Sequence, residues 1–178
     1  MQNQFKVSIS QYTDKGRKKI NQDFHDVRIP KEPQLTNKGI AIAIADGISS
    51  SDVSQIASKV SVTSFLTDYF ATPESWTVNK SAQRVLASIN SWLYSQSKQG
   101  QYQYDQDRGY VCTFSGMIIR SRTAHIFYAG DTRIYRLRDN QLEQLSEDHR
   151  LRVSQAKSYP SPSPGMDPQI PIDHAMFP

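Results

Sequence analysis

Carboxylates stand in this sequence where a strand end could present them for chemistry. Asp46 closes an apolar run and is followed by Gly47, and Asp23 follows Gln22. Carboxylate oxygens are the ligands that Mg²⁺ and Mn²⁺ prefer, and a cation held by them can activate water against a phosphate ester. Gly47 lacks a side chain, so its backbone oxygen could approach a metal closely. These residues allow metal-assisted chemistry, but on their own they favour Asp46 as a cap of the helix that follows.

A basic cluster and a tight turn could complete such a site. Arg17, Lys18 and Lys19 precede Asp23 by a few residues, and a cation beside a carboxylate suits phosphate binding. Asp131 lies in a Gly-Asp-Thr turn between two strand candidates. Taken alone, the cluster is more typical of a solvated basic turn, and most such aspartate turns are structural.

Other reactive residue types give no site. The sequence lacks a Gly-x-Ser-x-Gly elbow, and its histidines show no metal-ligand spacing. Cys112 is the single cysteine and lies in an apolar strand pattern without a phosphate-binding loop, so we expect a small core residue. Zinc and serine-hydrolase chemistry are disfavoured. The histidines are His25, His125, His149 and His174.

Composition indicates one ordinary globular domain. Of 178 residues, 37% are hydrophobic and 21% charged with both signs interspersed, which excludes a disordered or collagen-like chain. The net charge of +4 is a modest excess, so nucleic acid is a weak expectation that rests on charge alone. One cysteine permits no internal disulfide, and no run is apolar and long enough for a membrane span. A cytoplasmic protein without a membrane partner is expected.

Periodicity predicts the elements in the first half of the chain. Alternation over residues 5–10 predicts a strand, and residues 39–45, Gly-Ile-Ala-Ile-Ala-Ile-Ala, predict a strand covered on both faces. Apolar spacings of three and four predict a helix over 52–70, with Ser50 or Ser51 as N-cap, and a second from Ser81 to about Leu93. Residues 95–108 are expected to form a loop.

The second half has the pattern of a β meander. Strands are expected over 110–120, 124–129, 133–137 and 142–145, with Asp139-Asn140 as the last turn. Proline crowds the sequence from residue 160, which predicts an extended tail. Strands, then two helices, then strands is not the alternation of a parallel sheet. The sequence therefore predicts an α+β fold with antiparallel sheets and helices packed on an outer face.

The order of four short motifs carries a family resemblance. They are Arg-Lys-Lys-Ile-Asn-Gln-Asp at 17–23, Ala-Asp-Gly-Ile-Ser-Ser at 45–50, Ala-Gly-Asp-Thr-Arg-Ile-Tyr at 129–135 and Leu-Ser-Glu-Asp-His at 145–149. In this order they resemble the metal-dependent serine/threonine protein phosphatases (PPM, type 2C), particularly bacterial members. Each motif alone is weak.

The resemblance implies a sandwich of two antiparallel β-sheets flanked by helices, with two Mn²⁺ or Mg²⁺ ions at one end. By this resemblance, a hydroxide bridging the metals attacks phosphorus directly, and a third metal is held more weakly. The roles implied for individual residues are a bridging carboxylate at Asp46, a carbonyl ligand at Gly47, metal-shell positions at Gln22 and Asp23, a third-metal ligand at Asp131, and phosphate binding by Lys18 or Arg17.

Departures from the family pattern open an alternative function. Gln22 stands where the family usually has glutamate, Ser49 and Ser50 where glycines are favoured, and the family's later Asp-Gly and Asp-Asn metal motifs lie beyond the point at which this sequence stops. We therefore expect residues 1–158 to form a partial phosphatase domain lacking the C-terminal third, and 159–178 a Pro-rich extended tail. Asp139-Asn140 spells Asp-Asn in the wrong place and receives no metal role.

Two functions follow from the resemblance. The first is hydrolysis of phosphoserine and phosphothreonine in proteins, in a signalling context that includes a cognate kinase. The second is a pseudophosphatase or fragment that binds a phosphoprotein or kinase without hydrolysing it. The missing carboxylates favour the second, because each carboxylate ligand that is lost removes both charge and geometry from a metal site.

Overall fold

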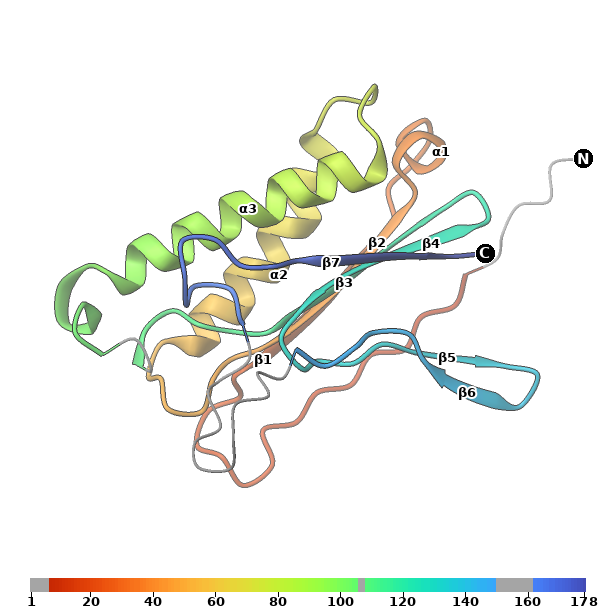
Figure 1. The fold of residues 1–178 in the computed structure, drawn as a ribbon. Coiled ribbons are helices and arrows are strands. Elements are labelled where there is room, and N and C mark those ends of the chain that lie inside the picture. Colours follow the sequence, from red (N-terminus) through yellow and green to blue (C-terminus); the bar gives the residue numbers. More distant parts are fainter. Residues whose placement is uncertain (1–6, 106–107, 150–161) are drawn as a thin grey trace, which may run out of the picture.

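The computed structural model describes residues 7–105, 108–149 and 162–178. Its main element is a five-stranded antiparallel sheet in the order β1-β2-β3-β4-β7. Two long helices cover one face of this sheet, and a separate two-stranded sheet, β5-β6, lies away from them (Figure 1). The α+β class with two antiparallel sheets and flanking helices is confirmed.

The bounds of the elements differ in places from the predicted ones. The strands are β1 Asp23–Arg28, β2 Ile40–Asp46, β3 Phe114–Arg120, β4 Thr123–Ala129, β5 Tyr135–Arg138, β6 Gln141–Gln144 and β7 Asp173–Phe177. The helices are α1 Gln34–Lys38, α2 Ser54–Ala71 and α3 Val78–Ser97, with a short 3-10 helix at Gly100–Tyr102.

The two faces of β2 explain how the helices dock. Alternation sends Ala41, Ala43 and Ala45 to the helix side, where each is at most 1% exposed. Small side chains let α2 approach the sheet closely, and Phe65 of α2 fills the space against Phe114. The opposite face carries the isoleucines, and Ile44 is 39% exposed. The expectation of a strand covered on both faces is therefore wrong for the described residues.

Helix starts were predicted with mixed success. Helix α2 has Val53 as N-cap and no side-chain cap, so neither Ser50 nor Ser51 is the N-cap. Helix α3 begins three residues before Ser81, because the Thr77 side chain accepts a hydrogen bond from the Lys80 amide. It also runs to Ser97, so the predicted loop over 95–108 starts too early.

Near the N-terminus one strand was predicted wrongly and another was missed. Residues 7–10 form no strand, and the rest of the strand expected over 5–10 lies outside the described residues. The edge strand β1 was missed because Asp23, Asp26 and Arg28 interrupt its apolar pattern. The hairpin was predicted correctly: Asp139 and Asn140 have φ of 49° and 61°, as a two-residue type I′ turn requires.

The C-terminal segment packs against both layers. Residues 173–177, expected within the extended tail, form β7 and pair with β4. They contain no proline, and β7 is an edge strand, where neighbouring prolines are tolerated. The Asn90 side chain on α3, 3% exposed, accepts from the Gly165 amide and donates to the Asp167 and Pro168 carbonyls at 3.0 and 3.1 Å. The predicted boundary at residue 158 lies outside the described residues.

Candidate active site

The antiparallel register collects the candidate residues at one end of the main sheet. Asp23 at the start of β1 lies directly opposite Asp46 at the end of β2. The start of β3 and the end of β4 reach the same end, where Phe114 pairs with Ala129. The turn that carries Asp131 follows immediately. Residues that are far apart in sequence therefore lie at the same end of the main sheet.

The Asp23–Asp46 pair is electrostatically strained. The pKa of Asp46 is raised from 3.8 to about 6, mainly because packing removes solvent from its carboxyl group. A hydrogen bond with Asp23 and repulsion by the Asp23 charge raise the pKa further. Asp131 adds to the rise, whereas Lys18 opposes it. Two carboxylates that face each other with little compensation form an arrangement that a bound cation would relieve.

The backbone of Asp46 is fixed by Thr113. The Thr113 amide donates to the Asp46 carbonyl at 2.7 Å, and the Asp46 amide donates to Thr113 Oγ1 at 3.1 Å. The Thr113 hydroxyl also contacts the hydroxyl of Thr132, and Ser115 Oγ donates to the Thr132 carbonyl at 2.9 Å. Sequence reasoning missed Thr113, although a threonine directly before a strand at a site was a usable signal. The network ties the aspartate to the turn of Asp131.

Asp46 does not cap the following helix. Helix α2 begins at Ser54, and its N-cap residue Val53 makes no capping bond through its side chain. The Val53 amide instead donates to Ser51 Oγ at 3.1 Å. The capping alternative for Asp46, which the isolated residues favoured, is therefore wrong.

Gln22 secures the loop between β2 and α2. Its amide nitrogen donates to the Ile48 and Ser51 carbonyls, each at 3.1 Å, and to Ser54 Oγ at 2.8 Å. Its backbone carbonyl accepts from the Gly47 amide at 3.0 Å and from Ser58 Oγ at 2.6 Å. A glutamate could not donate these three side-chain bonds, which gives the glutamine at this position a structural reason.

Lys18 lies beside this loop. Its ammonium group donates to Gln22 Oε1 and Ser49 Oγ, each at 3.4 Å. Lys18 and Lys19 line a hollow of about 370 Å³ together with the first turn of α2, whereas the exposed Arg17 is not among its lining residues. Of the two candidates for phosphate binding, Lys18 is the one whose charge acts on Asp46. The hollow is lined by Lys18, Lys19, Ile20, Gln22, Ser49, Ser51, Asp52 and Gln55.

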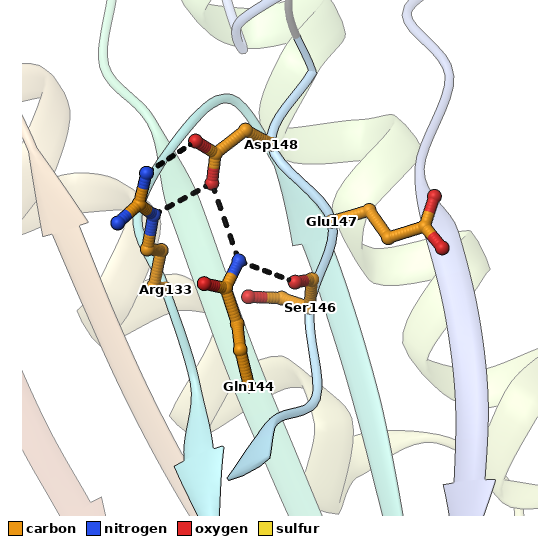
Figure 2. A pocket seen from close by; sticks show the side chains of 5 residues that line it. All are labelled: Arg133, Gln144, Ser146, Glu147 and Asp148. Carbon is orange, nitrogen blue, oxygen red and sulfur yellow. Dashed lines mark hydrogen bonds and ion pairs between the residues drawn. The ribbon is translucent and has the colours of Figure 1, made fainter.

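A second hollow is lined by Arg133, which follows the Asp131 turn, and by Gln144 and residues 146–148. Arg133 forms a two-pronged ion pair with Asp148, at 2.8 and 2.6 Å, and Gln144 donates to the Ser146 carbonyl at 2.7 Å (Figure 2). Glu147 points to the other side of the segment. The polar side chains of this hollow are thus engaged mainly in holding the segment after β6 against the turn.

Other chemistry-bearing residues are structural. Cys112 is fully buried beside Ser61, and burial raises the pKa of its thiol to about 12, so the prediction of a small core residue is confirmed. No group of three or more His, Cys, Asp or Glu side chains within 7–105, 108–149 and 162–178 has metal-site geometry. The facing carboxylates of Asp23 and Asp46 could supply part of the ligand set of a divalent cation.

Comparison with known proteins identifies the family. A family model described as protein phosphatase 2C matches residues 13–172. The chain belongs to the protein phosphatase 2C family. No curated protein sequence gives a significant match.

Solved structures of bacterial phosphatases share this fold. One is a bacterial serine phosphatase, with 19% identity, a TM-score of 0.72, and coverage of 93% of this chain and 70% of that one. Serine/threonine phosphatase Stp1 from Staphylococcus aureus has 20% identity and a TM-score of 0.73, over 93% and 68% of the two chains. PstP/Ppp of Mycobacterium tuberculosis has 16% identity and a TM-score of 0.65, over 90% and 68%. At these identities the likeness concerns the fold. None of the described helices is long and apolar enough to cross a membrane.

Proposed function

We propose that this phosphatase 2C chain hydrolyses phosphoserine and phosphothreonine in proteins with the help of Mn²⁺ or Mg²⁺. The observation that carries the proposal is the facing pair Asp23 and Asp46: loss of solvent first, and then the neighbouring Asp23 carboxylate, raise the pKa of Asp46 to about 6. A cation between two such oxygen ligands removes the repulsion. Divalent cations bound there would lower the pKa of water and neutralise charge on phosphoryl oxygens.

Each residue has a role that its surroundings support. Asp46 would be shared between two cations, with Asp23 and the Gly47 carbonyl as neighbouring ligands, and Asp131 would serve a third. Lys18 would hold the substrate phosphate, since it is kept in place by Gln22 and Ser49. Arg17, the alternative phosphate-binding residue, is exposed and lies outside the lining of the hollow beside Lys18. Gln22 would support Lys18 and the loop, and its oxygen would reach the metal shell only through water.

A phosphothreonine peptide tests the proposal. The purified chain is incubated with the peptide and Mn²⁺, and released phosphate is measured. Turnover should depend on Mn²⁺ and should be lost in Asp46→Asn. The matched control is Asp139→Asn, which makes the same change in the exposed hairpin turn. Equal turnover in Asp46→Asn and the wild type would reject the site.

A binding function without hydrolysis is the second candidate. It is favoured by the lack of any cluster of three metal-ligating side chains in the part of the chain that the structure describes. In that case the chain should bind the phosphothreonine peptide through Lys18, and Mn²⁺ should neither bind saturably nor alter peptide affinity. Lys18→Met should weaken peptide binding, whereas Lys59→Met on α2 should leave it unchanged.

The biological setting is proposed from the same chemistry. A phosphoprotein substrate implies a serine/threonine kinase that supplies the phosphate, and both would meet this chain in the cytoplasm. One structural neighbour is titled PppA, a key regulatory component of the T6SS in Pseudomonas aeruginosa, with 19% identity and a TM-score of 0.65. A regulatory signalling role is therefore proposed here, to be tested by comparing phosphoproteins in cells with and without the intact chain.

A further inference from the structure

His149 links the turn of Asp131 to the last strand of the sheet. Its Nε2 atom lies 2.8 Å from Asp173 Oδ2 on β7. Its Nδ1 atom accepts a hydrogen bond from the Gly130 amide at 3.4 Å, and its own backbone amide donates to the Gly130 carbonyl at 3.0 Å. The ring packs against Tyr128, with centroids 5.6 Å apart, and the side chain is only 12% exposed.

These contacts select one form of the imidazole. A nitrogen that accepts from a backbone amide carries no hydrogen, so Nδ1 is bare. The hydrogen of the neutral ring is then on Nε2, from which it can be donated to the Asp173 carboxylate. Each ring nitrogen therefore has a different partner. If the hydrogen were on Nδ1 instead, it would face the hydrogen of the Gly130 amide, and the bare Nε2 would face the Asp173 carboxylate.

The turn of Asp131 is held from two sides. On the sheet side, Thr132 contacts Thr113, which also fixes the backbone of Asp46. On the other side, His149 closes around Gly130 with one backbone and one side-chain bond. The ion pair of Arg133 with Asp148 holds the same two segments together, three residues after Gly130 and one residue before His149 (Figure 2).

Gly130 is suited to this clamp, in which Thr113 contacts the turn from one side and His149 from the other. Its φ is +103°, and a Cβ at this position would lie 2.8 Å from the Thr113 side chain. The turn can therefore lie against Thr113 only with glycine here. Asp131 itself is exposed, and its charge reaches Asp46.

We propose that His149 is a positioning residue for Asp131, and that its neutral Nε2–H form sets the distance between the Asp131 turn and Asp46. This inference rests on the proposed function for the metal role of Asp131, but the geometry of the clamp does not. In this proposal His149 is neither a metal ligand nor a substrate contact. Its effect reaches the site only through Gly130.

Two isosteric variants separate the two ring nitrogens. Asparagine reproduces the Nδ1 position, so His149→Asn keeps an acceptor for the Gly130 amide. Glutamine reproduces the Nε2 position, so His149→Gln keeps only the donor to Asp173. The matched control is His125→Gln, because His125 contacts His174 on the neighbouring strand at 3.3 Å and not the turn.

Nitrogen NMR of the full chain gives the first readout. The His149 ring of the wild type should show a protonated Nε2 and a bare Nδ1. The Gly130 amide should exchange with solvent about fivefold or more faster in His149→Gln, as expected for a lost hydrogen bond, and within about twofold of wild type in His149→Asn. A ring protonated on Nδ1, or equal exchange in the two variants, overturns the proposal.

Manganese gives the second readout. Paramagnetic broadening of the Asp131 amide by Mn²⁺ should persist in His149→Asn and in the His125 control, and should fall in His149→Gln. Broadening that is equal in both His149 variants contradicts the positioning role. If Mn²⁺ broadens nothing in the wild type, the proposed metal function fails, while the ring form and the Gly130 exchange rates still decide the role of His149.

Discussion

The two faces of the main sheet differ in how they are covered and in what they carry. The face toward α2 and α3 bears alanines and buried aromatic rings. The other face bears Ile44, which is 39% exposed, and at its end the carboxylate of Asp46, which alternation places on the same side. The candidate chemistry thus belongs to the open face, whereas the closed face supplies the rigidity that holds it in place.

The largest expected effect tests whether the closed face dominates stability. Phe65→Ala on α2 removes a fully buried ring that packs against Phe114, with centroids 5.1 Å apart. The free energy of unfolding should fall by about 3–5 kcal/mol. Ile44→Ala on the open face is the comparison, and should lower it by about 1 kcal/mol or less, since much of that side chain is already in solvent. Equal losses in chemical denaturation would contradict the asymmetry.

The next effect concerns the hydrogen bonds by which Gln22 holds the loop between β2 and α2. Gln22→Glu should lower the free energy of unfolding of the metal-free protein by about 1–3 kcal/mol, because the Ile48 and Ser51 carbonyls lose their donor and face a charge instead. Gln55→Glu, in the first turn of α2, is the matched control and should be nearly neutral, since helix N-termini favour negative charge. A stabilised Gln22→Glu without metal would show that the loop does not depend on this donor.

A smaller effect of opposite sign is expected on the open face. Because the pKa of Asp46 is raised to about 6, the folded state binds a proton more readily than the unfolded state between 3.8 and about 6. The ionised carboxyl group of Asp46 therefore destabilises the folded state most above about pH 6. Asp46→Asn should raise metal-free stability by about 1 kcal/mol at about pH 8, reduced by solvent screening at this exposed residue, and should change nothing below the unfolded pKa.

Thermal unfolding measures this effect at the two pH values. A gain of about 1 kcal/mol corresponds to about 2–4 °C in a chain of this size. Adding Mn²⁺ should reverse the order of the two proteins, because only the wild type retains the carboxylate. A stability difference that does not depend on pH would rule out the Asp23–Asp46 repulsion as its cause.

The smallest effect is expected at the hairpin. Leu137 and Leu142 face each other across β5 and β6 and are 71% and 69% exposed. Leu137→Ser should change the free energy of unfolding by about 0.5 kcal/mol or less. A much larger loss by denaturation would mean that this pair is covered in solution.

Sequence reasoning succeeded where one pattern decided the structure. The run of small and β-branched residues predicted β2 with Asp46 at its end, and Asp139-Asn140 predicted the hairpin turn, because left-handed backbone there restricts the residue types. The two long helices were predicted from apolar spacing, with errors at their ends, where capping depends on single side chains such as Thr77, whereas the short α1 was missed.

Pairing across the sheet could not be predicted in the same way. That Asp23 lies opposite Asp46 depends on the register of an edge strand whose charged residues hide its pattern. The clamp around Gly130 joins residues from β4, the segment after β6 and β7, and no local spacing signals it. Proline density predicted a separate tail, but local composition does not reveal that five proline-free residues pair with β4.

The amide of Asn90 has a consequence for how the molecule opens. It is buried in α3 and hydrogen-bonded to the backbone of Gly165, Asp167 and Pro168, so moving that segment away would leave a buried polar group of the helix without these partners. The stretch after residue 162 and the middle of α3 should therefore melt in one cooperative step. Amide hydrogens of both would then exchange at a common rate, although more than seventy positions of sequence separate them.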